Sequence, residues 1–212
     1  MDNSSQLKQF FLNSYHPQST LYSCGPAVIK MVANYFRKTE NIFGPIDESI
    51  LTANNESFLS ALFKTNEKEG TDFTMMTTML NEMGCLIDHG QIHNSIKKVK
   101  SFPLHFKKLL KEGIPIVVNY TYHLKKKDPL TQSSEVGHFG VIYGVNDLEI
   151  LIYDPAEHFK LNIAKEKMTI TEFLGDWKSG NGEIGIYLIL YPNEHSYERL
   201  SYELHLNKSK NN

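Results

Sequence analysis

The residue best placed for chemistry is Cys24, which lies where an irregular segment gives way to a predicted helix. Apolar residues at helical spacing follow it over 28–36, and Pro26 suits a first helical turn, where its missing N–H costs nothing. Unpaired backbone N–H groups and the positive end of the helix dipole favour an anion at such a position. A thiol there ionises more readily than a free one, so Cys24 is a candidate nucleophile.

Three other residues complete the set that cysteine chemistry requires. A thiolate nucleophile needs a base, a group that orients the base and a donor for the developing oxyanion. His138 follows a glycine at the start of a predicted strand and is the candidate base, and Asp154 at the end of the next strand is the candidate orienting group. Gln18, six positions before the thiol, is the candidate oxyanion donor together with the backbone N–H of Cys24.

The elements that must position these side chains change type halfway along the chain. Apolar spacing in the first part predicts helices over 58–63, 73–83 and 102–110, with Thr71 and Asp72 as candidate caps of the second helix and Gly84 as its stop. The second part predicts strands over 114–120, 137–145, 148–153 and 184–191, a hairpin turn at 146–147 and a helix over 169–177. We therefore expect an α+β fold, in which a helical N-terminal half packs on an antiparallel β-sheet. Paired antiparallel strands bring the start of one near the end of the other, so His138 and Asp154 are expected to meet.

The size of the chain predicts a single catalytic domain. Its 212 residues, 41% of them hydrophobic, can bury one real core. We expect this domain over residues 1–192 and a polar, frayed C-terminal tail over 193–212. The long polar loop over 123–136 is a candidate lid or substrate-binding edge, because long loops in compact domains are often functional.

Several motifs resemble those of one enzyme family. The segment 18–27 resembles the cysteine motif of papain-like enzymes, and in detail that of the C39-like peptidases. The segments 137–145 and 150–156 look like the His and Asp segments of that family, in the same order along the chain. A Gly-Ile-Pro-Ile-Val-Val strand at 113–118 and the predicted helix around 173–177 are also similar.

The resemblance covers about residues 10–190, apart from the segment 38–70, which matches nothing in the family. It implies a papain-like cysteine protease fold and a cysteine hydrolase, most closely a peptidase with a peptide or protein substrate. It also implies the catalytic residues, which are Cys24, His138, Asp154 and Gln18. It implies no cofactor, and it leaves the oligomeric state open.

Two alternatives stay open. Phytochelatin synthases share the papain-like scaffold and the order of the Cys, His and Asp residues. The segments 118–120 and 137–139 also look like segments of those enzymes. This resemblance implies a γ-glutamylcysteine transpeptidase or glutathione hydrolase. Against it, 133–136 lacks the glycine-flanked stretch that those synthases carry, while 154–156 and 173–177 look more like the C39-like peptidases. The other alternative is a non-catalytic binding module on a papain-like scaffold.

Composition excludes several other classes. A net charge of −2 and an estimated pI of about 6.5 give no basis for nucleic-acid binding, and the local lysine clusters are typical of solvated faces. No apolar run reaches the roughly 18 residues of a membrane span. The first residues lack the pattern of a signal peptide, and two cysteines cannot form a disulfide framework. We expect a cytoplasmic protein without membrane contact, although export without an N-terminal signal stays open.

The remaining candidates for chemistry are weak. Asp88, His89 and His93 have a spacing that could hold a metal, but without a further recognisable ligand they are expected in a surface loop, and no metal site is predicted. Cys85 has no adjacent basic partner and is expected to be an unreactive core residue entering a short strand.

Overall fold

The computed structural model describes residues 14–38, 56–93, 104–123, 135–156, 167–177 and 184–209. The helices are α2 (Cys24–Lys38), α4 (Glu56–Leu62), α5 (Phe73–Glu82), α6 (Leu104–Lys111), α7 (Ile170–Asp176) and α8 (Glu194–Ser209). The strands are β1 (Ile87–His93), β2 (Ile116–His123), β3 (Glu135–Val145), β4 (Glu149–Tyr153), β5 (Lys167–Thr169) and β6 (Ile184–Leu190). The predicted α+β class is confirmed.

The strands form one antiparallel sheet in the order β1-β6-β2-β3-β4-β5. β3 and β4 make the predicted hairpin, with Val141 paired to Tyr153. The side chain of Asn146 closes its turn by accepting the N–H groups of Leu148 and Glu149 at 2.8 and 2.7 Å. Because these hydrogen bonds fix the turn, they also fix the register between β3 and β4.

The strand pairing brings the predicted site residues to one end of the sheet. Tyr120 on β2 lies directly opposite His138 on β3. Asp154 follows the last residue of β4, which pairs with β3 on its other side. The start of β3 and the end of β4 therefore meet, as the sequence predicts.

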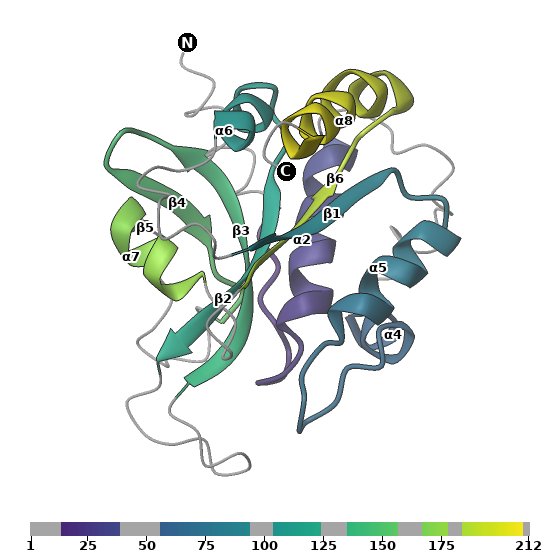
Figure 1. Ribbon diagram of the computed structural model, residues 1–212. Coiled ribbons are helices and arrows are strands. Elements are labelled where there is room, and N and C mark those ends of the chain that lie inside the picture. The colour runs from purple at the N-terminus through teal and green to yellow at the C-terminus, as the bar shows by residue number, and fades with distance from the viewer. Residues whose placement is uncertain are drawn as a thin grey trace.

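Helices cover both faces of the sheet (Figure 1). On one face α2, α4 and α5 pack through side chains such as Phe36, which lies in one buried cluster with Val141. On the other face α6, α7 and α8 contribute Phe106, Phe173 and their neighbours to a second cluster that includes Ile142. The helical N-terminal part thus packs on the antiparallel sheet as expected, and the later helices complete a second layer.

Two predicted helix boundaries have identifiable causes. The side chain of Asp72 caps α5 by accepting the N–H of Met75 at 3.0 Å. Gly84, just beyond that helix, has φ +76°, a left-handed conformation that favours glycine. Both residues act as the sequence predicts.

The C-terminal region differs from the polar tail expected over 193–212. Residues 194–209 form helix α8, whose Leu200 is only 2% exposed. Arg199 of this helix makes a two-pronged contact with Glu112 after α6, at 3.3 and 2.7 Å. Tertiary contacts thus stabilise a segment whose own sequence is mostly polar.

Other expectations fall on or near the limits of the described residues. The strands β2 and β3 include the ends of the predicted loop 123–136, whose remainder lies outside the described residues. Residues 39–55 of the segment 38–70 also lie outside the described residues, and the part that follows them contains α4.

Asp88, His89 and His93 belong to strand β1 rather than to a surface loop. Among the described residues, no helix has the length and apolar character needed to cross a bilayer.

Candidate active site

Cys24 is the first residue of α2 and is 5% exposed. A tight turn leads into it, in which Ser23 and Thr20 exchange hydrogen bonds: the N–H of Thr20 donates to Oγ of Ser23 at 3.0 Å. A side chain at Gly25 would lie 2.6 Å from the side chain of Thr71, so only glycine fits directly after the thiol. The thiol therefore sits at the positive end of the helix dipole, the position that the sequence predicts.

His138 and Asp154 meet directly. Nε2 of His138 lies 2.7 Å from Oδ1 of Asp154, and both side chains are almost fully buried. The ionised carboxylate can only accept, so Nε2 donates and Nδ1 is the ring nitrogen left for another partner. A hydrogen bond with Cys24 is among the contacts of the His138 side chain. Cys24, His138 and Asp154 thus form a connected chain of polar groups.

The charges of this chain stabilise one another. Burial alone would lower the pKa of His138, but the charge and hydrogen bond of Asp154, and then those of Cys24, raise it well above its usual range. Burial would raise the pKa of Asp154, but His138 and hydrogen bonds from Ala156 and Tyr120 hold it below its usual value. A protonated imidazole beside an ionised Asp154 is therefore favoured at neutral pH.

Two groups that hold Asp154 were missed by the sequence prediction. The hydroxyl of Tyr120 donates to Oδ2 at 3.0 Å, and the N–H of Ala156 donates to Oδ1 at 2.7 Å. The ring of Tyr120 also meets the ring of His138 edge-on, with centroids 5.6 Å apart. A tyrosine in an apolar strand carries no local signal for such a role, because in most strands it is simply part of the core.

The Gln18 side chain is only 4% exposed, and one of the two polar atoms of its amide makes a hydrogen bond. Nε2 donates to the carbonyl oxygen of Thr20 at 2.8 Å, whereas Oε1 has no hydrogen-bond partner among the described residues. The amide thus keeps one N–H free of the Thr20 contact, because a primary amide carries two donors.

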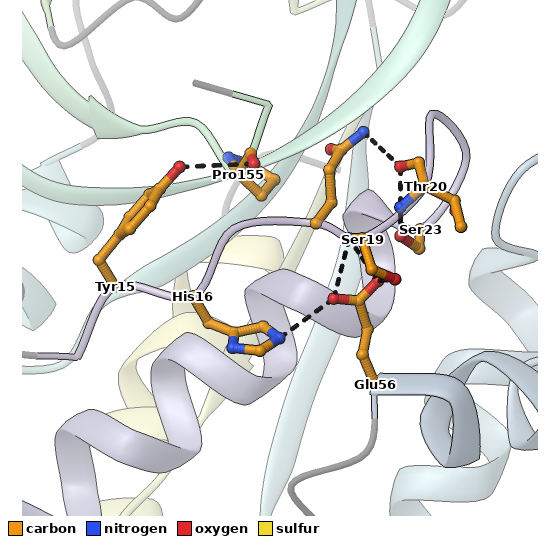
Figure 2. A network of polar contacts seen from close by, with 8 residues as sticks. Tyr15, His16, Ser19, Thr20, Ser23, Glu56 and Pro155 are labelled. Atoms are coloured by element: carbon orange, nitrogen blue, oxygen red, sulfur yellow. Dashed lines mark hydrogen bonds and ion pairs between the residues drawn. The ribbon is translucent and has the colours of Figure 1, made fainter. Parts of the chain in front are cut away.

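The segment before Cys24 is tied to the segment after Asp154. The backbone N–H of Gln18 donates to the carbonyl of Pro155 at 3.0 Å. The hydroxyl of Tyr15 lies 3.2 Å from the carbonyl oxygen of Asp154 and 3.4 Å from that of Pro155, and Figure 2 shows the contact with Pro155. These bonds couple the position of the thiol segment to that of the carboxylate, although about 140 residues separate Tyr15 from Pro155 in the sequence.

The second cysteine lies in a different environment. Cys85 is 6% exposed in the cluster that packs α2 and α5 against the sheet, so its predicted core position is confirmed. Burial raises the pKa of the Cys85 thiol to about 12. Among the described residues, no three or more His, Cys, Asp or Glu side chains gather as a metal site would require.

Comparison with known proteins gives one family profile and a similar solved structure. The profile of the family described as "Peptidase_C39 like family" matches residues 5–183. No curated protein sequence matches at a significant level. Among solved structures, the peptidase domain of Streptococcus ComA, a bi-functional ABC transporter involved in a quorum sensing pathway, is similar. It is 19% identical over 84% of this chain and 97% of that chain, with a TM-score of 0.48.

Proposed function

The chain belongs to the Peptidase_C39-like family, and we propose that it is a papain-like cysteine peptidase that uses a Cys24–His138–Asp154 triad with Gln18 as an oxyanion donor. The observation that carries the proposal is the 2.7 Å contact between His138 and Asp154, together with the hydrogen bond of the same imidazole to Cys24. A nucleophile, a base and a group orienting that base within mutual reach are what acyl transfer by a thiol requires.

The proposed reaction has two stages. The thiolate of Cys24 attacks the carbonyl carbon of a peptide bond, and the C–N bond then breaks as the imidazolium of His138 gives its proton to the leaving amine. Neutral His138 next takes a proton from water, whose oxygen attacks the thioester; the C–S bond breaks, and the acid leaves with the Cys24 thiolate and the His138 imidazolium restored. Asp154 keeps its charge throughout. Its hydrogen bond keeps a proton on Nε2 of the imidazole and orients the ring so that Nδ1 faces the sulfur.

The oxyanion of each stage would be held by two N–H groups. One is the backbone N–H of Cys24 at the start of α2, and the other is the amide hydrogen of Gln18 that does not contact Thr20. Donors that are fixed before the reaction stabilise developing charge without a reorganisation cost, and removing one such donor typically costs about 10²–10³ in kcat. The 2.8 Å bond from Gln18 to Thr20 supports this role, because it restrains the amide.

An activated ester tests the proposal without knowledge of the natural substrate. Incubation with p-nitrophenyl acetate should acetylate Cys24, release nitrophenolate in a burst and then turn over as water removes the acetyl group. Intact-mass analysis and peptide mapping locate the adduct. Cys24→Ala should lose both burst and adduct, whereas Cys85→Ala should keep them; a burst that survives in Cys24→Ala would refute the assignment.

The two alternatives from the sequence have their own signatures. A γ-glutamylcysteine transferase would release glycine from glutathione in the presence of a divalent metal ion, which a peptidase would not do. A non-catalytic binding module would show an intact fold and a Cys24 that reacts with iodoacetamide no faster than an ordinary thiol. A peptide or protein is the substrate class that we propose, since the family is one of peptidases.

A further inference from the structure

A buried carboxylate outside the proposed triad contacts the segment that leads to the nucleophile. Glu56 is the first residue of α4 and is only 5% exposed. It lies more than thirty positions after Cys24, in the part of the sequence that carries no recognisable motif. Buried carboxylates are rare unless donors compensate them, so the contacts of Glu56 call for a specific explanation.

The partners of Glu56 among the described residues all come from one short stretch before the thiol. The N–H of Ser19 donates to Oε1 and Oε2 at 2.9 and 3.1 Å, and the Ser19 hydroxyl donates to Oε1 at 2.7 Å. Nε2 of His16 lies 3.1 Å from Oε2. Figure 2 shows His16 and Ser19 converging on the carboxylate at the start of α4.

These contacts keep Glu56 charged. Burial would raise the pKa of Glu56, but hydrogen bonds from His16, Ser23 and Ser19 lower it to about 2. A buried anion with several donors from one segment holds that segment strongly, because any movement would leave its charge uncompensated.

The anchored segment carries both proposed oxyanion donors. Gln18 directly precedes Ser19, and Ser23 directly precedes Cys24. We propose that Glu56 is a positioning residue that fixes the oxyanion side of the active site through Ser19. The inference rests on the proposed peptidase mechanism, and Glu56 itself touches neither the substrate nor the reacting atoms.

Two reactions of the same thiol distinguish this role from a merely structural one. Acylation by p-nitrophenyl acetate passes through a tetrahedral oxyanion and needs the donors of this segment. Alkylation by iodoacetamide forms a carbon–sulfur bond and expels iodide, so no oxyanion develops. It depends on the proposed ion pair of Cys24 with His138, and His138 is not among the hydrogen-bond partners of Glu56. A loss confined to acylation would therefore identify a defect in oxyanion positioning.

The experiment compares both rates in Glu56→Ala, Glu56→Gln and the control Glu67→Gln, which changes an exposed glutamate of the following loop. Glu56→Ala should acylate at least about tenfold more slowly, since small misplacements in active sites cost up to about 10²-fold. Its alkylation rate should stay within about twofold of the wild type. Glu56→Gln should recover much of the acylation rate, because its amide oxygen still accepts from Ser19. The control should change neither rate.

Two results would overturn the inference: an unchanged acylation rate in Glu56→Ala, or an equal fall of acylation and alkylation.

If Glu56→Ala does not fold, Ser19→Ala removes only the 2.7 Å hydroxyl bond. It should slow acylation by about threefold and leave alkylation unchanged, and equal rates for Ser19→Ala and the wild type would refute the role. A wild-type protein that shows no acylation burst would instead refute the proposed function, and the positioning role would fall with it.

Discussion

Replacing Asp154 by asparagine removes a charge from the site and leaves its shape. The amide oxygen of Asn can still accept from His138, so the main change is the loss of the anion 2.7 Å from Nε2. Two unit charges with centres about 4 Å apart interact by about 4 kcal/mol at an effective dielectric constant of about 20. At about 1.4 kcal/mol for each pH unit, the pKa of His138 should fall by about 3.

The direction of this change follows from the carboxylate, which favours the protonated imidazole. Without it, the pKa of His138 should fall from about 10 to about 7, so that only about half of the imidazole is protonated at pH 7. NMR titration of the His138 ring measures the pKa, and the iodoacetamide rate at pH 7, which depends on the protonated imidazole, should fall at least about twofold. The control Asp147→Asn changes a fully exposed residue in the turn between β3 and β4 and should alter neither value. A pKa of His138 in Asp154→Asn that stays within about one unit of the wild type would refute this reasoning.

Three further predictions concern the surroundings of the site. Tyr120→Phe deprives Asp154 of one donor, so denaturant unfolding should show a loss of about 1–3 kcal/mol, and an unchanged midpoint would argue against the bond. Gly25→Ala places a methyl group 2.6 Å from Thr71 and should destabilise the fold by about 1–3 kcal/mol; a melting temperature equal to the wild type would contradict the close approach. The pKa of Glu56 falls from 4.5 to about 2 on folding, so the stability advantage of the wild type over Glu56→Gln should be complete above pH 4.5 and disappear as the pH falls through about 2. Unfolding curves across this range measure it, and an advantage that does not vary with pH would contradict a charged Glu56.

The parts of the site that lie on regular elements could be predicted from sequence. Pro26 and the apolar stripe behind it mark the start of α2, which places Cys24 at a helix N-terminus. The Asn146 turn indicates the hairpin of β3 and β4, and a hairpin brings His138 to Asp154. These inferences succeed because helix starts and tight turns depend on local residues, whose preferences are visible in the sequence.

The groups that support the site could not be predicted in the same way. Glu56 contacts Ser19 across 37 positions, and nothing near either residue indicates that a glutamate is buried there. Tyr120 lies in an apolar strand, and the neighbouring sequence does not indicate that its hydroxyl contacts Asp154. Helix α8 has a mostly polar sequence and depends on contacts such as that of Arg199 with Glu112. Each of these features depends on tertiary contacts, which local propensity does not report.

The most direct test of the active-site account compares the two cysteines within one molecule. Limited alkylation with iodoacetamide at neutral pH, followed by peptide mass spectrometry, gives the labelled fraction of Cys24 and of Cys85 in the same sample. The proposed ion pair with His138 predicts fast labelling of Cys24, whereas a thiol pKa of about 12 predicts almost none at Cys85. Equal labelling of the two thiols, or faster labelling of Cys85, would contradict the proposal that Cys24 is the nucleophile.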